Sequence, residues 1–452
     1  MNIHSRRFLA GFFILIFIII APLLILYTAG YRYSIKKQRL TSAGSLVIET
    51  EPRDATVYLS NHDKSYKTPA RINDLTSNDY QITITKDGYY NWNKTLKIES
   101  QQTTFAENII LFSKASATPI LQNISGNIYP DHQHQNIIFT QDSTLKIYNI
   151  ETNKILTIKQ LEDNQIVQDI NWSINNNYFL IQLHDNDIIQ HIVANKNNPT
   201  NTITIENYLQ DIKNPVVKFN RTNDDRLLIL NQNNLYGAKI NLSSLEISTF
   251  YSFPKDLLIS DYLVYKDQIF FLEKTSDKQY LKKIVPTNKN NDKNNRIQLS
   301  SSEYQLIDFI DNKIFLKDFT KNTTFIINSG LDNVLFEQND LIQYDFNAKS
   351  KKLAMTTPSE INVVDFNNYP FNVITVIRVS NGLQKTFWYF DPNYLIFQEN
   401  NQLKTIELDE RDQRHIITLS PENTSDFFLD STGKFLSLLT SNSTFEKLIL
   451  IQ

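Results

Sequence analysis

Hydrophobic and polar positions divide the chain into three regions with different patterns. The first region is an uninterrupted apolar run, residues 8–29, that holds no charged residue. At about 1.5 Å per helical residue this run reaches about 33 Å, which is enough to cross a hydrocarbon core of about 30 Å. The pattern predicts a transmembrane helix over 8–29 behind a short tail of residues 1–7, and Pro22 is tolerable inside such a helix.

A cleaved secretory signal is the alternative interpretation of this run. The apolar region of a signal peptide spans about 7–15 residues and is therefore shorter, although Thr28-Ala29-Gly30 offers a small-residue cleavage site. Flanking charge favours an inside location for the C-terminal side, because four basic residues within 30–43 outnumber Arg6 and Arg7. We nevertheless expect a cytoplasmic amino terminus and extracytoplasmic C-terminal domains, since long domains translocate largely regardless of charge.

A strand-like alternation follows a polar and basic juxtamembrane linker, residues 30–43. Alternating apolar positions predict strands over 44–50, 55–59, 79–85, 92–98 and 105–112. Turn signals separate these segments at Glu51-Pro52-Arg53-Asp54 and at Lys86-Asp87-Gly88-Tyr89, where glycine suits a positive φ. The pattern predicts a small β-sandwich over 44–113.

Residues 44–113 resemble the PEGA domain family, small antiparallel β-sandwiches of bacterial and archaeal surface proteins. The residues that carry the resemblance, all expected to be structural, are Pro52, Ala55, Val57, Tyr58, Leu59, Thr68, Pro69, Tyr80, Gly88, Tyr89 and Trp92. The chain departs from the family at Asp54, where the motif has Gly, and at Asn78-Asp79, where Pro-Gly is frequent. Asp and Asn tolerate the left-handed conformation, so the turns survive these changes.

The resemblance implies an extracytoplasmic interaction or spacer module without catalytic residues. We interpret Trp92 and Tyr89 as packing residues rather than as a platform for carbohydrate.

A third pattern starts near Thr118 and recurs to the end of the chain. Each copy has a turn cluster rich in Asp, Asn, Ser and Lys, then an apolar strand, a polar turn and another strand. The clearest copies are 172–181, 219–230, 346–354 and 428–436, and weaker copies begin near Tyr129, Tyr262, Leu306 and Tyr389. The spacing of roughly 40–45 residues is that of a four-stranded propeller blade. We predict a β-propeller over 118–452 with eight blades, or seven if the first and last units share one blade.

These units resemble the TolB-like or PD40 class of WD-related repeats. Asp430-Ser431-Thr432-Gly433-Lys434 followed by Phe435 and Leu436 is the best match, and most other copies replace Gly with Asn or Asp. The expected fold class is mainly β: an N-terminal transmembrane helix, a small PEGA-like β-sandwich and a C-terminal β-propeller.

Composition and motifs narrow the function. The 45 basic and 48 acidic residues are mixed along the chain, which argues against a nucleic-acid-binding surface. Absence of Cys excludes disulfides, thiolate metal sites and a Cys nucleophile. Asp131-His132-Gln133-His134 has the only compact His spacing, and we interpret it as a solvated loop; His184-Asp185-Asn186-Asp187 reads as a blade turn. No catalytic motif is present, so we predict no catalytic, cofactor-binding or metal-binding residue.

The expected function is that of a non-enzymatic, single-pass protein of the cell membrane. It would display the PEGA-like module and the propeller toward a protein or a cell-surface polymer, without a cofactor or nucleic acid. Two alternatives stay open: a glycan hydrolase or lyase with its site in the propeller channel, and an envelope assembly factor that resembles TolB. Fold analogy alone does not choose among them.

Overall fold

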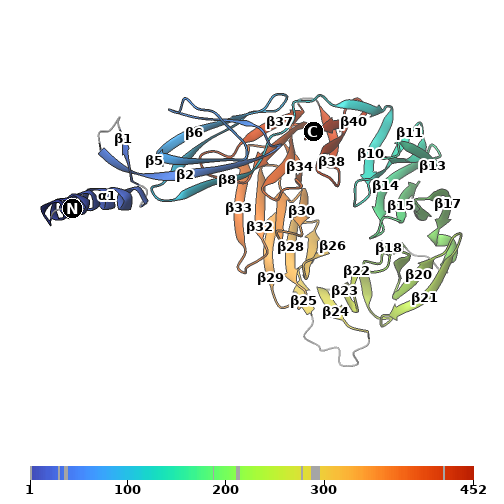
Figure 1. The fold of residues 1–452 in the computed structure, drawn as a ribbon. Coiled ribbons are helices and arrows are strands. Elements are labelled where there is room, and N and C mark those ends of the chain that lie inside the picture. Colours follow the sequence, from blue (N-terminus) through green and yellow to red (C-terminus); the bar gives the residue numbers. More distant parts are fainter. Residues whose placement is uncertain are drawn as a thin grey trace. The chain divides into compact units, whose positions relative to one another are not determined.

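A computed structural model describes residues 3–28, 31–34, 39–186, 188–209, 214–275, 278–286, 296–420 and 423–451 (Figure 1). The chain forms two compact units. The first unit comprises Met1–Ser116, Thr405–Leu419 and Ile449–Gln452, and the second comprises Ala117–Lys404 and Ser420–Leu448.

The first unit begins with helix α1 (Ile3–Thr28). Within it, Phe8–Thr28 is long and apolar enough to cross a membrane, and none of that stretch is buried inside the structure. Pro22 lies inside the helix, and the Thr28 hydroxyl donates a hydrogen bond to the carbonyl oxygen of Leu24 at 3.0 Å. The apolar helix expected from the sequence is therefore present, and Ala29 lies outside the described residues.

Two four-stranded sheets follow the helix. In the first sheet β2 (Arg39–Glu51) pairs with β1 (Tyr31–Ser34), β5 (Ala70–Thr76) and β8 (Thr103–Ile110). The second sheet has the order β4 (Tyr66–Lys67), β3 (Thr56–Leu59), β6 (Asn78–Thr85) and β7 (Trp92–Ile98). The β2–β8 pair is parallel, because the chain leaves β7 in one sheet and enters the other sheet alongside β2. The expectation of a purely antiparallel sandwich was wrong for this pair.

The sandwich is held by one apolar core to which both sheets contribute, with fully buried residues such as Leu46, Ile48, Val57 and Ile82. Each such side chain contributes about 1.5–3 kcal/mol when buried. Gly44 is required by close packing, since a Cβ atom there would lie 2.2 Å from the carbonyl oxygen of Glu99.

The described part of residues 118–449 forms eight four-stranded sheets, which we number blades 1–8. Blade 1 contains β10 (Ile124–Pro130), β11 (Asn136–Gln141), β12 (Thr144–Asn149) and β13 (Lys154–Gln160). Blade 2 contains β14 (Gln165–Trp172), β15 (Tyr178–Asp185), β16 (Ile188–Asn195) and β17 (Asn198–Thr204), and the short helix η1 (Ile205–Tyr208) follows it. Blade 3 contains β18 (Val216–Phe219), β19 (Arg226–Asn231), β20 (Asn234–Ile240) and β21 (Leu245–Ser252). Blade 4 contains β22 (Leu258–Tyr265), β23 (Gln268–Lys274), β24 (Gln279–Ile284) and β25 (Arg296–Leu299).

Blades 5 to 8 repeat the same order. Blade 5 contains β26 (Tyr304–Ile310), β27 (Lys313–Asp318), β28 (Thr323–Asn328) and β29 (Val334–Asn339). Blade 6 contains β30 (Gln343–Asn347), β31 (Lys352–Thr356), β32 (Glu360–Asp365) and β33 (Asn372–Arg378). Blade 7 contains β34 (Leu383–Trp388), β35 (Tyr394–Glu399), β36 (Gln402–Glu407) and β37 (Ile416–Ser420). Blade 8 contains β38 (Thr424–Leu429), β39 (Phe435–Thr440), β40 (Phe445–Ile449) and, as its fourth strand, β9 (Thr118–Leu121).

Contacts between consecutive blades close these sheets into a ring. Apolar clusters join blades 1 to 6 in sequence, and another joins blade 8 to blade 1 through Phe428 and Phe139. The Trp388 indole donates to the Asp345 carbonyl between blades 6 and 7 at 3.0 Å, and Lys385 contacts Asp426 between blades 7 and 8 at 2.6 Å. Residues 118–449 therefore form a β-propeller of eight blades. The two ends of the repeat region share blade 8, where β9 pairs with β40.

The repeat copies recognised in the sequence coincide with one structural feature. Each copy spans the corner between the first and second strands of a blade, as in Trp172 at the end of β14 and Tyr178 at the start of β15. The second strands read as continuous apolar runs because both of their faces are buried between neighbouring blades, as in β19.

Candidate functional site

The PEGA-like signature residues have three kinds of position. Most are core residues of the sandwich: Ala55, Val57, Leu59, Tyr80, Tyr89 and Trp92. The buried Thr68 hydroxyl accepts from the Ala55 N–H at 3.0 Å and contacts the Thr50 hydroxyl at 2.6 Å, and Thr50 also donates to the carbonyl of Pro52. These bonds bring the turn at Pro52 and the segment at Thr68-Pro69 together.

The remaining signature residues lie at the surface or in turns. Gly88 has a φ of +78°, and the Tyr89 N–H donates to the Lys86 carbonyl at 3.1 Å, as expected for a tight turn. Asp54, which replaces the family glycine, has a φ of 63°. Tyr58 is the one exposed aromatic residue of the signature among the described residues.

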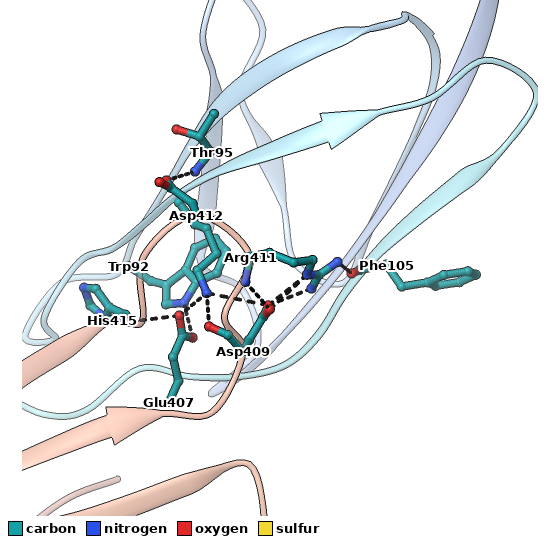
Figure 2. A network of polar contacts seen from close by, with 9 residues as sticks. Trp92, Thr95, Phe105, Glu407, Asp409, Arg411, Asp412 and His415 are labelled. Atoms are coloured by element: carbon teal, nitrogen blue, oxygen red, sulfur yellow. Dashed lines mark hydrogen bonds and ion pairs between the residues drawn. The ribbon is translucent and has the colours of Figure 1, made fainter. Parts of the chain in front are cut away.

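Strand β7 carries a charged side chain on its inward face. Its burial alternates strictly, so that Lys94 faces inward together with Trp92, Leu96 and Ile98. The Lys94 ammonium is fully buried and forms an ion pair with Glu407, whose side chain is also buried. It also donates to the carbonyl oxygen of Asp409 at 2.9 Å (Figure 2). A buried ammonium requires such partners, because leaving it unpaired is strongly destabilising.

Trp92 takes part in the same contact. Its indole N–H donates to the Glu407 carboxylate at 3.0 Å, and the side chain is buried (Figure 2). A buried ring offers no face for stacking against a sugar. Trp92 therefore packs in the core and also orients the Glu407 carboxylate. The sequence analysis predicted the packing role of Trp92 but not its hydrogen bond to Glu407.

The partners of Lys94 and Trp92 come from the segment Glu407–His415, which links β36 to β37 and which we call the acidic loop. Two further residues of the acidic loop bind backbone groups of the sandwich. The Asp412 carboxylate accepts from the Thr95 N–H of β7 at 2.7 Å, and the Arg411 guanidinium donates to the Phe105 carbonyl of β8 at 2.8 Å (Figure 2). Both groups belong to edge strands, so the acidic loop satisfies hydrogen-bonding groups that the ladders leave open.

Charge and burial set the protonation of the acidic loop. Burial raises the pKa of the Asp409 carboxyl, but the hydrogen bonds from Arg411 and the charge of Lys94 outweigh it and hold that pKa below its usual range. The hydrogen bond to Asp409 raises the pKa of Arg411. Burial lowers the pKa of His415, against the nearby charge of Glu407. Near neutral pH the loop therefore presents carboxylates and a guanidinium.

The propeller has its own recurring polar feature on the first strands of its blades. First strands contact each other between blades 4 and 5, blades 6 and 7, and blades 8 and 1, and Figure 1 shows the first strands on the inner side of the ring. Five blades carry an Asp on this strand, followed by an aromatic residue or Ile: Asp169, Asp261, Asp308, Asp345 and Asp426. In four of them a carboxylate oxygen accepts the N–H of the following residue at 2.7–2.9 Å. Sequence analysis missed this repeat, although the Asp-aromatic pairs recur at the blade spacing.

Basic side chains engage three of these carboxylates. Lys218 contacts Asp261 at 2.7 Å, Arg221 contacts Asp308 at 2.6 Å, and Lys385 contacts Asp426 at 2.6 Å. None of these three basic side chains contacts Asp345. Its carboxylate instead accepts the backbone N–H of Trp388 at 2.8 Å, and burial raises the pKa of the Asp345 carboxyl. The inner carboxylates thus serve as acceptors that tie strands together.

The histidine motifs proved to be structural turns. The His134 ring bonds the Leu429 carbonyl of blade 8, and His132 contacts the Trp172 carbonyl of blade 2 at 3.3 Å, so the turn links three blades. The interpretation of a solvated loop was wrong for His134, which is half-buried. His184 and Asp185 end β15, whereas Asp187 lies outside the described residues. No group of three or more His, Asp or Glu residues in the described part of the chain is arranged to hold a metal ion.

Comparisons with known proteins agree with this architecture. Residues 43–109 match the family model described as PEGA domain. No curated protein matches the chain. The Dos1 propeller structure has a TM-score of 0.51 at 10% identity, covering 74% of this chain and 95% of that chain. The C-terminal WD40 domain of Sif2 has a TM-score of 0.49 at 11% identity, covering 74% of this chain and 99% of that chain. At these identities the likeness to the Dos1 propeller concerns the fold alone, a β-propeller.

Proposed function

We propose that the protein is a non-enzymatic, single-pass membrane protein that displays a PEGA module and a propeller outside the cytoplasm, where they bind a protein or a cell-surface polymer. The observation that carries this proposal is the order of the parts. An apolar helix, a PEGA match and a propeller fold follow one another in the same chain.

The connection between helix and sandwich supports a display role. Strand β2 runs without interruption from Arg39 to Glu51 and pairs with β1, which begins three residues after α1 ends. At about 3.3 Å per residue, a strand of this length spans roughly 40 Å. A paired strand is stiffer than a free linker, so the module would be held near the membrane in a defined way.

The state of the inner carboxylates supports a binding role rather than catalysis. A glycosidase needs two carboxyl groups free to act as acid and base or nucleophile. Here Asp261 accepts the N–H groups of Tyr262 and Leu306, both at 2.8 Å, besides its contact with Lys218. The oxygens of this carboxylate are occupied by hydrogen bonds and a cation that join neighbouring blades. The hydrolase or lyase alternative therefore has less support than a binding role.

Exposed apolar side chains lie at both ends of the propeller, and the end at which the first strands begin is the proposed binding surface. Ile166 and Leu258 lie at the starts of first strands and Phe319 follows a second strand, which is the same end of an antiparallel sheet. Exposed apolar side chains favour a protein partner over a polar polymer, and Leu242 and Phe390 at the opposite end are as exposed, so the crosslinking test below distinguishes the two ends.

Protease treatment of intact cells, with and without lysis, tests the proposal. We expect external protease to cleave the propeller while a cytoplasmic control protein survives. Full protection of the propeller until lysis would reverse the orientation and remove the surface role. In the same cells, photo-crosslinkers at positions 166 and 258 should capture a protein, whereas one at the exposed Leu242 on the opposite end should not.

A further inference from the structure

The PEGA module has a side that its own residues leave incomplete. Residues 43–109 account for the family match, yet Lys94 on β7 carries a fully buried ammonium whose carboxylate partner is more than 300 residues away in sequence. Residues 43–109 alone would leave this cation without its carboxylate partner. The missing partner is supplied by the acidic loop, within the same compact unit.

The same side contains edge strands that the acidic loop protects. The other two edges have their own protection: β4 has only two residues, and β5 is interrupted by Asp74 with a φ of 63°. Strand β7 has neither device, and the interruption of β8 at Asn108, with a φ of 59°, lies beyond Phe105. Instead, the Thr95 N–H and the Phe105 carbonyl point away from their ladders toward Asp412 and Arg411.

We propose that the side of the PEGA module between β7 and β8 is a binding site for an acidic segment, and that the acidic loop is its resident ligand. The indole N–H of Trp92 and the Lys94 ammonium recognise a first carboxylate, at Glu407. The Thr95 N–H recognises a second carboxylate five residues later, at Asp412. The site thus selects the pattern Glu-x-Asp-x-Arg-Asp of residues 407–412.

The form of the contacts explains why the acidic loop acts as a ligand rather than as a ninth strand of the sandwich. Side chains of the loop bind edge groups of the module, and no ladder pairing between the loop and β7 or β8 is present in the described residues. Charge-assisted bonds of this kind are short and directional, and a second segment with the same pattern can make them equally well. This inference does not depend on the proposed membrane topology or on the propeller's partner.

Competition with a synthetic peptide of residues 405–416 tests the proposal in the full-length chain. The triple variant Glu407→Gln, Asp409→Asn, Asp412→Asn weakens the resident ligand without changing its length. We expect the labelled peptide to bind this variant saturably, to bind the wild type at least about tenfold more weakly, and to lose binding when Lys94→Met is added. A folded triple variant that does not bind the peptide would overturn the proposal.

A second measurement decides the matter if the triple variant does not fold. Amide hydrogen exchange at Thr95 should be about tenfold or more faster in the single variant Asp412→Asn, because its acceptor is weakened. The peptide should restore slow exchange. Glu410→Gln is the matched control, since Glu410 lies in the same loop with an exposed side chain. Equal exchange at Thr95 in both variants, or exchange that the peptide does not slow, would contradict the proposed site.

Discussion

Individual residues decide where charge is buried in this protein. Lys94 occupies an inward position of an otherwise regular strand, and its side chain and that of Glu407 are 0% and 4% exposed. Removal of one member of a buried ion pair leaves an uncompensated charge, whereas replacement of both members by apolar groups is often tolerated.

We therefore expect Lys94→Ala to destabilise the chain by about 3–5 kcal/mol and the double variant Lys94→Met, Glu407→Leu to recover part of that loss, because Glu407→Leu also removes the acceptor of the Trp92 indole N–H. Denaturant unfolding followed by Trp fluorescence measures both. Lys97→Ala, at an exposed position of the same strand, serves as control and should unfold like the wild type. If Lys94→Ala matched that control, the buried pair would contribute nothing.

His134 makes the stability of the propeller depend on pH. Burial lowers its pKa below the usual 6.5, against the opposing effects of its bond to Leu429 and the charge of Asp131. The folded state therefore binds a proton at His134 less readily than the unfolded state does. The neutral imidazole contributes to the free energy of unfolding above pH 6.5, and this contribution is lost as the pH falls through the pKa that His134 has in the folded state.

We expect the free energy of unfolding of the wild type to decrease as the pH is lowered from 7.5 to 5. The free energy of unfolding of His134→Asn should decrease less steeply over the same range. Unfolding curves at each pH provide the measurement. His62→Gln, in an exposed turn, should keep the wild-type pH profile. A wild-type profile in His134→Asn would show that the ring nitrogen contributes nothing to this dependence.

At the scale of elements, strand β9 determines whether the propeller is closed. It comes from the start of the repeat region and completes blade 8 next to β40. Phe445 on β40 is fully buried and packs against Phe428 and Tyr148, with ring centroids 6.1 and 6.3 Å away. The closure therefore combines strand pairing with an aromatic cluster between blades 8 and 1.

Phe445→Ala should cost about 3–5 kcal/mol, because it leaves a cavity between the first and last blades. Limited proteolysis should then cleave near β9 earlier than elsewhere in the propeller. Phe250→Ala, on the outer strand of blade 3 and 43% exposed, is the control and should keep β9 protected. Cleavage that began at another blade would argue against closure at this seam.

At the scale of the whole molecule, the role depends on whether α1 stays attached. A membrane anchor and a cleaved signal share the same length and apolar composition, and the structure shows one such helix over Phe8–Thr28. The two interpretations differ in the mature protein.

We expect the mature protein to retain residues 1–28 and to require detergent for extraction. Mass spectrometry of its N-terminal peptide gives a direct measurement, and replacement of Leu15 and Ile18 by Lys should release the chain from membranes. A mature N-terminus at Gly30 would show that the segment is removed and would eliminate the anchor.

The sequence by itself determined the features that depend on local pattern. The apolar helix, the turn at Gly88 and the corners of all eight blades were predictable, because each depends on residues that are close together in the chain. Strand β5 escaped prediction because the bulge at Asp74 interrupts its alternation.

The tertiary structure alone decided the pairings between distant segments. The local pattern around Lys94 does not show that the folded chain brings Glu407 to it. Four of the five inner Asp residues likewise meet a cation or a distant N–H only in the folded ring: Asp261, Asp308, Asp345 and Asp426. Which partner a charged side chain meets depends on the closure of long loops, and no local period encodes that. The parallel β8 and the shared blade 8 have the same origin, since both result from segments that meet only after the rest of the chain has folded.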